Sequence, residues 1–338
     1  MNESWTIGRL LSWTKEYFER SGVESPRLCA EVLLAHCVGC SRIELYARFT
    51  SEPDEPQRTQ FRELVKRASQ HEPVSYLVGS REFYSLSFKV TPDVLIPRPE
   101  TEMLVEKAVE HLQKLSGVHV TQQNFDSHES GPVDLDKVEK TAAAQDETQA
   151  ASDASPAFKP KPKPRYVGNV WDVCTGSGCV ACAIAANAPG VKVLASDISP
   201  AALAVAEENA TKLGLTQQVT FIPADLLSLP ADSPYNDEFF DVITANPPYV
   251  AESDPVGEST KFEPRGALYA GADGMDVLRR LIPQVPKKLG HGGIFCVEFG
   301  YTQADAVRNL IMQTGEFAEP EIFKDSQGIE RIALAKRK

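Results

Sequence analysis

The chain contains the run Phe239-Phe240-Asp241-Val242-Ile243-Thr244-Ala245-Asn246-Pro247-Pro248-Tyr249, in which apolar and β-branched residues lead into an amide, two prolines and a tyrosine. An apolar run of this length predicts a buried strand. Proline locks its backbone φ angle, so the residues after the strand form a rigid polar tip. The run therefore predicts a core strand that presents an amide side chain at its end.

This tip carries the groups that can hold a planar NH2 group. The side-chain carbonyl of Asn246 can accept one N–H, and the backbone carbonyl of Pro247 can accept the other. Tyr249 can lie against the flat face of the substrate. The predicted substrate site is made of Asn246, Pro247, Pro248 and Tyr249, and all of these except Pro248 are expected to be catalytic. An ordinary polar turn is the alternative, because Asn-Pro and Pro-Pro are common in loops.

A second predicted strand, residues 167–173, leads into a turn that contains glycine. The turn is Cys174-Thr175-Gly176-Ser177-Gly178, and residues 179–186 then have the spacing of a helix. The amides of such a turn and the N-terminus of the helix face the place where a ligand binds. We therefore expect these turn residues to bind a cofactor.

Asp197 follows the next predicted strand, residues 191–195, and lies 25 residues after Asp172. At this spacing an acidic side chain can accept both hydroxyls of a ribose. Capping the next helix is the alternative role for Asp197, but Ser199, which precedes a proline, is the better cap. We therefore predict that Asp197 binds the cofactor.

Strands and helices alternate through the rest of the chain, which predicts an α/β fold with a mostly parallel sheet. The tips of consecutive parallel strands share one edge of the sheet, so their polar residues are expected to lie near one another. The remaining predicted elements are helix 201–213, strand 219–222, helix 275–289, strand 293–299 and a final antiparallel pair, 317–323 with 329–335.

Three other regions have patterns of their own. Residues 1–80 have helical spacing and predict a small all-helical domain, which either recognises the substrate or packs on its neighbour. Residues 81–97 alternate apolar and polar residues, which predicts an extended hairpin linker. Residues 98–338 form the predicted catalytic domain, with a disordered insertion at 116–165, where apolar anchors are few and lysine alternates with proline.

The net charge, the cysteines and the apolar runs of the chain limit the kinds of partner and ligand that we expect. The 338 residues carry a net charge of −12 without an evident basic patch, which argues against direct nucleic-acid binding. Seven cysteines, an odd number, predict reduced thiols, and the Cys37/Cys40 and Cys179/Cys182 pairs are too far apart for a compact zinc module, so no metal site is expected. No apolar run reaches membrane-spanning length and no secretion signal is recognised, so we expect a cytoplasmic protein without a membrane partner.

Four motifs occur together behind the helical domain and Arg81-Glu82-Phe83-Tyr84. They are Ile96-Pro97-Arg98-Pro99-Glu100-Thr101-Glu102, Asp172-Val173-Cys174-Thr175-Gly176-Ser177-Gly178, Asn246-Pro247-Pro248-Tyr249 and Val297-Glu298-Phe299-Gly300. In this combination the chain resembles the peptide chain release factor glutamine methyltransferases. The resemblance covers the chain outside residues 116–165. Asn-Pro-Pro-Tyr is shared with other amino methyltransferases, whereas the Pro-Arg-Pro-Glu-Thr-Glu loop is more specific.

The resemblance implies a Rossmann-like class I methyltransferase sheet with an antiparallel C-terminal strand and a small N-terminal helical domain. It implies methyl transfer from S-adenosylmethionine to the side-chain amide nitrogen of the glutamine in the Gly-Gly-Gln loop of a class 1 release factor. The cofactor-binding residues that it implies are Cys174, Thr175, Gly176, Ser177, Gly178, Asp197, Asp225, Leu226 and Asn246. Arg98 and Glu100 are expected to join the substrate site, although a solvated loop cation is the alternative for Arg98.

One residue departs from the family pattern. The family usually has glycine where this chain has Cys174, so the first turn position carries a Cβ atom, and a positive φ angle there would be strained. We expect cofactor binding to survive because the later glycines remain.

The acceptor determines the expected mechanism. An amide nitrogen has its lone pair in conjugation, so the enzyme must align that nitrogen with the methyl group rather than rely on a strong base. The exocyclic amine of adenine is also flat and conjugated, so a DNA or RNA adenine methyltransferase is an alternative. A methyltransferase acting on a ribosomal protein glutamine and a non-catalytic cofactor-binding protein are the others.

Overall fold

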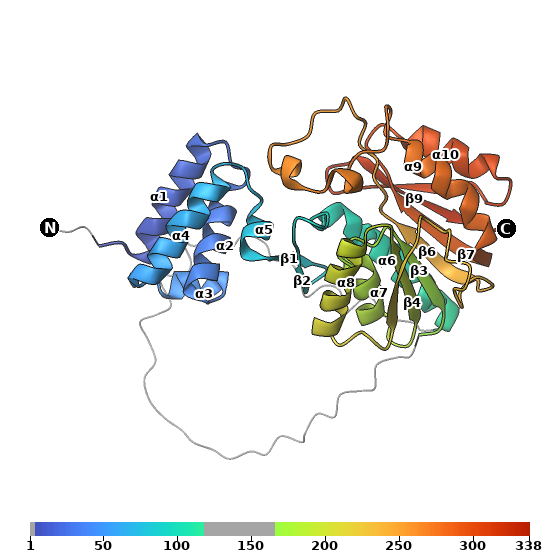
Figure 1. The fold of residues 1–338 in the computed structure, drawn as a ribbon, viewed down its shortest axis with the longest axis horizontal. Coiled ribbons are helices and arrows are strands. Elements are labelled where there is room, and N and C mark those ends of the chain that lie inside the picture. Colours follow the sequence, from blue (N-terminus) through green and yellow to red (C-terminus); the bar gives the residue numbers. More distant parts are fainter. Residues whose placement is uncertain (1–3, 118–165) are drawn as a thin grey trace, which may run out of the picture.

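The computed structural model describes residues 4–117 and 166–338. The expected insertion at 116–165 lies outside the described residues from residue 118 onward. Figure 1 shows a group of helices at the N-terminal end and a larger α/β part that contains the C-terminus, with a short hairpin between them. This is the predicted fold class, an α/β sheet behind a helical N-terminal region.

The N-terminal region is built from five helices with clear sequence signals at their starts. Ser41 and Asp54 each form a capping box, in which the side chain accepts a backbone N–H and the third helical residue reaches back. Phe18, Leu33 and Phe61 lie in the shared core. The helices are α1 (Ile7–Arg20), α2 (Pro26–Val38), α3 (Arg42–Ala47), α4 (Glu55–Ala68) and α5 (Val74–Val78).

A β-hairpin follows, made of β1 (Ser80–Phe83) and β2 (Leu86–Lys89). Its two turn residues, Tyr84 and Ser85, both have positive φ angles, which gives the turn a twist that suits a hairpin. Asn209 ties this hairpin to the α/β part. Its side chain accepts from Lys89 N at 2.6 Å and donates to Lys89 O at 3.0 Å. The same amide donates to Ser177 O at 2.9 Å, so one buried side chain joins the hairpin to the glycine-containing turn.

The sheet has seven strands in the order β5-β4-β3-β6-β7-β9-β8. The first five strands in this order are parallel, and β9 pairs antiparallel with both β7 and β8. The strands are β3 (Asn169–Val173), β4 (Lys192–Asp197), β5 (Val219–Pro223), β6 (Phe240–Ala245), β7 (Leu289–Glu298), β8 (Glu321–Lys324) and β9 (Glu330–Lys336). The mostly parallel sheet with an antiparallel C-terminal strand is therefore confirmed.

Helices cover both faces of the sheet, as Figure 1 shows. One apolar cluster contains α6 (Glu102–Ser116) and α7 (Cys179–Asn187), with part of α8 (Pro200–Lys212). The other contains α9 (Asp276–Leu281) and α10 (Ala304–Gln313). Because both faces are buried, the parallel strands are nearly continuous apolar runs.

Several predicted boundaries differ from those observed: β7, for example, begins at Leu289 rather than at residue 293. Proline explains two of the differences. The expected helix at 275–289 is α9 followed by a 3-10 helix, Ile282–Lys287, because Pro283 and Pro286 supply no backbone N–H for an α-helix. The final antiparallel pair was expected to begin at Phe317, which forms an isolated antiparallel bridge with Arg337. The continuous strand β8 begins later, at Glu321, directly after Pro320, which cannot donate to a sheet.

Candidate active site

A cavity of about 260 Å³ lies where β3, β4 and β6 end, at the edge of the sheet that their carboxyl ends share. The turn after β3 forms part of its wall, and so do residues 197–199 after β4. Asn246 and Pro248 enter from the tip of β6, and Arg98 and Thr101 enter from the loop and short 3-10 helix before α6. Residues far apart in the sequence therefore meet in one enclosed space.

The turn after β3 has the backbone shape that the glycines predict. Gly176 has φ +55°, and a Cβ atom there would meet no atom within 4 Å, so its backbone is open to the cavity. Gly178 has φ +77° and lies against α8, where an added Cβ atom would be 3.0 Å from that of Ala206. Cys174 has φ +59°, so this non-glycine residue does adopt the strained conformation expected of it.

Asp197 braces this turn. Its Oδ2 accepts from Gly176 N at 2.9 Å and its Oδ1 accepts from Ser199 N at 2.9 Å. Burial raises the pKa of Asp197, while these amide donors act in the opposite direction. The cap of α8 is Ser199, whose hydroxyl accepts from Ala202 N. Asp197 is therefore placed beside the cavity and does not cap the helix with its side chain.

Asp172 lies in the same wall and was not among the predicted site residues. It is buried, and its two oxygens accept from Thr175 Oγ1 at 2.6 Å and Thr244 Oγ1 at 2.7 Å. Burial raises the pKa of this carboxyl to about 6, against the effect of both hydroxyl donors. The partner Thr244 is opposite Asp172 in the β3–β6 register, which the sequence does not reveal.

The Asn246 side chain is held by a chain of hydrogen bonds. Its Nδ2 donates to Thr101 Oγ1 at 3.1 Å, and Thr101 Oγ1 donates to Glu298 Oε2 at 2.7 Å. The other Glu298 oxygen accepts from Tyr249 OH at 2.9 Å. Within residues 4–117 and 166–338, no hydrogen bond engages Asn246 Oδ1. The acceptor end of the amide is thus available at the cavity.

Glu298 ends β7 and is only 1% exposed. Burial raises its pKa to about 7, although the hydrogen bonds from Thr101 and Tyr249 favour its charged form. Burial and the neighbouring Glu298 carboxylate raise the pKa of the Tyr249 hydroxyl. Thr101 and Glu298 belong to two of the motifs that carry the resemblance, and that was the only signal of a role for them.

Arg98 is not a free loop cation. Its guanidinium forms an ion pair with Glu263 Oε1, and Glu263 Oε2 accepts from Ile96 N at 3.0 Å. Arg98 also borders a second hollow of about 490 Å³, whose other residues come mostly from the helical region and from the segment around Glu258, together with Arg81 and Ile96. This arginine therefore lies between the cavity and the N-terminal helices.

The cavity brings together many, but not all, of the residues predicted from the sequence. Those that line it are Arg98, Cys174, Thr175, Gly176, Ser177, Asp197, Asn246 and Pro248. Those outside its lining are Glu100, Gly178, Asp225, Leu226, Pro247 and Tyr249. Asp225 is exposed and ion-paired with Arg280, and the buried Leu226 has a positive φ angle of 57°. The functional roles of all these residues stay predictions.

No helix in residues 4–117 or 166–338 is both long and apolar enough to cross a membrane. In the same ranges, no group of three or more histidine, cysteine, aspartate or glutamate residues is arranged to hold a metal ion.

The chain matches two family profiles and is similar over nearly its whole length to named relatives. Residues 9–79 match the PrmC N-terminal domain, and residues 168–328 match a methyltransferase domain. A release factor glutamine methyltransferase from Rhodopirellula baltica is 39% identical over 97% of this chain and 95% of its own length. The enzymes of that name from Geobacter sulfurreducens and Koribacter versatilis are 32% and 35% identical over 98% of this chain and 96% and 99% of their own lengths. The resemblance is therefore confirmed, and this chain belongs to the release factor glutamine methyltransferase family.

Proposed function

We propose that this protein transfers a methyl group from S-adenosylmethionine to the side-chain amide nitrogen of the glutamine in the Gly-Gly-Gln loop of class 1 release factors. The observation that carries the proposal is the Asn246 amide, whose acceptor end is available at a cavity shaped by the turn after β3. The relatives named release factor glutamine methyltransferase support a release factor glutamine as the substrate.

The residues around the cavity fit S-adenosylmethionine. The cofactor, when bound, supplies a methyl group on a positively charged sulfur. The open backbone at Gly176 leaves room for close approach, and the Asp172 and Asp197 carboxyls favour a cationic ligand that also carries hydroxyls. We assign Asp197 to the ribose, Asp225 and Leu226 to the edge of the adenine, and the turn from Cys174 to Gly178 to the methionine end.

The tip of β6 orients the acceptor amide. Asn246 Oδ1 and the carbonyl of Pro247 accept the two N–H groups of the glutamine side chain, which fixes its nitrogen toward the methyl donor. As the bond forms, the nitrogen gains positive charge, and these two oxygens offset it. Pro248 lines the cavity beside the amide, and Tyr249 is proposed to lie against the flat face of the substrate. Arg98 and Glu100 are proposed to contact the loop that carries the glutamine.

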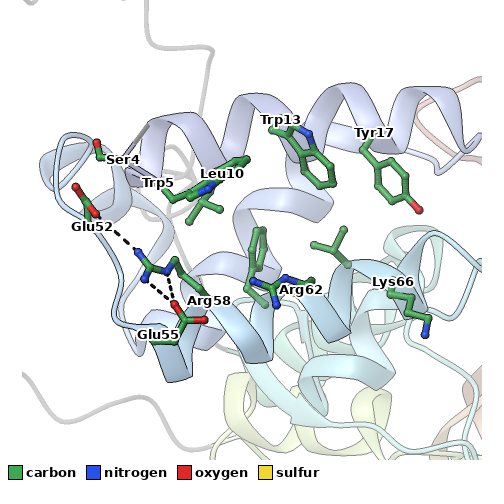
Figure 2. Close-up of a pocket in the computed structure, with 12 residues that line it drawn as sticks. Ser4, Trp5, Leu10, Trp13, Tyr17, Glu52, Glu55, Arg58, Arg62 and Lys66 are labelled. Carbon is green, nitrogen blue, oxygen red and sulfur yellow. Dashed lines mark hydrogen bonds and ion pairs between the residues drawn. The ribbon is translucent and has the colours of Figure 1, made fainter. Parts of the chain in front are cut away.

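The N-terminal helical domain, residues 1–80, is proposed to hold the release factor, with the hairpin segment 81–97 as its linker to the catalytic domain, residues 98–338. Figure 2 shows a groove between α1 and α4, with a volume of about 1140 Å³. Trp13 and Tyr17 on α1 are stacked with ring centroids 5.2 Å apart, and Trp13 is 45% exposed. Exposed aromatic surface of this kind is typical of protein interfaces.

The facing wall of this groove is basic. Arg62 and Lys66 extend from α4, as Figure 2 shows, whereas Arg58 is engaged by Glu52 and Glu55. No ion pair in the described part of the chain engages Arg62 or Lys66. The matching occupant is an acidic segment of the release factor that also carries an apolar anchor.

The experiment that tests the function offers a labelled methyl donor to the purified protein with separate acceptors. These acceptors are a class 1 release factor, the same factor with its Gly-Gly-Gln glutamine replaced, ribosomal proteins, DNA and RNA. We expect label only in the unaltered release factor. Label in ribosomal proteins or adenine would overturn the assignment. Because its proposed substrate works on ribosomes, we expect the protein to act in the cytoplasm.

A further inference from the structure

We infer that Thr101 and Glu298 are positioning residues that hold the Asn246 amide with its oxygen toward the substrate. This inference rests on the proposed function of the same site. Neither side chain is one of the predicted contacts with the substrate or the cofactor, and both are buried. They act through Asn246, which is the group proposed to meet the acceptor amide.

The direction of the hydrogen bonds determines how the amide must face. Thr101 has one hydroxyl proton, and it is donated to Glu298 Oε2 at 2.7 Å. Thr101 Oγ1 can then only accept, and what it accepts is the Asn246 Nδ2 donor at 3.1 Å. If the amide were turned over, its oxygen would face a hydroxyl oxygen without a proton between them. The nitrogen end therefore stays at Thr101, and the oxygen end faces the cavity.

Glu298 sets this direction because both of its oxygens act as acceptors. Thr101 donates to one oxygen, and Tyr249 donates to the other at 2.9 Å. The charged groups that bear on this carboxyl are Glu100, which disfavours its ionised form, and Arg331, which favours it. When Glu298 takes up a proton, one of its oxygens becomes a donor. The hydroxyl of Thr101 is then free to turn toward Asn246.

The hydrogen bonds also join three separate parts of the fold. Thr101 ends the 3-10 helix before α6, Asn246 follows β6, and Glu298 ends β7. A purely structural role would thus predict that any loss of these bonds lowers stability and all activities together. A positioning role predicts a selective loss in the methyl-transfer step.

Three variants separate the two roles. Thr101→Val keeps the shape of the side chain but removes the hydroxyl, Thr101→Ser keeps the hydroxyl, and Thr211→Val makes the same change at an exposed position on α8. We expect Thr101→Val to lower kcat on the release factor by about tenfold to a hundredfold, the scale of a misplaced catalytic contact. Thr101→Ser should stay within about threefold of wild type, and Thr211→Val should match it. Cofactor affinity should stay within a few-fold of wild type in all three.

Glu298→Gln supplies a second readout, the pH profile of kcat. We expect the wild-type kcat to fall as the pH drops and Glu298 becomes protonated, and we expect Glu298→Gln to lose this acid limb and remain slow at every pH. Titration by calorimetry and thermal melts on the same samples report cofactor affinity and folding.

Two results would overturn the inference. One is a Thr101→Val protein that methylates at the wild-type kcat. The other is an equal loss of kcat and melting temperature in Thr101→Val and Thr101→Ser, which would assign the hydroxyl a structural role. A wild type that methylates a different planar amide or amine would overturn the proposed function instead. The kcat values of Thr101→Val and Thr101→Ser on that acceptor would then test the positioning role, which requires Thr101→Val to be the slower of the two.

Discussion

At the scale of single residues, Asn246 is the group on which we expect the proposed methyl transfer to depend most. Asn246→Ala removes the oxygen that accepts from the acceptor amide, so we expect the single-turnover rate to fall by about 10²–10³, while cofactor affinity stays within a few-fold. If Asn246 only stabilised a turn, the variant would instead lose melting temperature and every function in proportion. A stable Asn246→Ala protein with the wild-type rate would contradict the mechanism.

Asn246→Asp is a sharper probe of the same side chain. The new carboxylate keeps an acceptor but removes the Nδ2 donor that Thr101 accepts, and it adds a negative charge near Glu298. We expect residual activity below that of wild type, because an acceptor remains while the donor to Thr101 is lost. A stable Asn246→Asp protein without any single-turnover activity would contradict the acceptor role.

Because burial raises the pKa of Asp172, we expect cofactor binding to depend on pH. Its pKa is about 6 in the structure, and its ionised form favours a cationic ligand. Affinity should therefore be fully present above this pKa and fall by up to about tenfold as the pH drops from 7 to 5, because the carboxyl becomes protonated. Calorimetric titration of wild type and Asp172→Asn checks this, since the amide has no proton to gain. The same pH slope in both proteins would assign the effect to another group, such as Asp197.

At the scale of elements, the hairpin depends on Asn209 for its attachment to α8. Asn209→Ala would leave Lys89 N, Lys89 O and Ser177 O without this partner. We expect the free energy of unfolding to fall by about 2–3 kcal/mol, since buried polar groups that lose a partner cost about 1–3 kcal/mol each. Cofactor affinity should fall as well, because the same amide holds the turn after β3.

The neighbouring residue provides a matched control for this attachment. Glu208 lies beside Asn209 on α8, and its side chain forms an exposed ion pair with the Lys89 ammonium. Glu208→Ala should change little, because exposed ion pairs contribute weakly. Denaturant unfolding of both variants measures how much free energy of unfolding each substitution removes. Equal losses would show that the charge of the hairpin, rather than the buried amide, holds it in place.

Helices and strands were predictable from the sequence where all local signals favoured the same structure. The strand before Asn246 was found from its apolar run, and Asp197 was found from its place after the next predicted strand, 25 residues beyond Asp172. The helix expected at 275–289 was wrong because its apolar spacing continued through two prolines, and the missing amide donors outweighed that spacing.

The hydrogen-bond partners in the site were not predictable in the same way. Glu298 reaches Thr101 only because the sheet order places β7 beside β6 and packs α6 against both strands. Asp172 meets Thr244 only through the register of two strands. Both facts depend on contacts between distant segments, which no local pattern in a single sequence encodes.

At the scale of the whole molecule, the proposed release factor contact separates recognition from chemistry. Arg62→Glu combined with Lys66→Glu reverses the charge of the groove wall, so we expect KM for the release factor to rise about tenfold with kcat nearly unchanged. The salt dependence of KM should also weaken. Steady-state assays at two salt concentrations check both expectations.

Arg20→Glu is the matched control for the groove. Arg20 lies in the last turn of α1 and is not part of the groove lining. The Arg20→Glu substitution changes the net charge of the helical region in the same direction as the double variant. If KM rose equally per substituted charge in both proteins, the cause would be the general charge of the region rather than the groove. Cofactor affinity should stay constant in both proteins, because the groove lies in a separate part of the fold.

The bonds that orient Asn246 also have a consequence for when the enzyme becomes active during its synthesis. Thr101 lies 145 positions from Asn246 and 197 positions from Glu298 along the chain. Glu298 itself is held by β7, which pairs with β9, so its place depends on strands that the ribosome makes later. Contacts this distant form late, after the intervening loops have closed. A nascent chain that already binds the cofactor would therefore still be unable to transfer a methyl group until its final strands have joined the sheet.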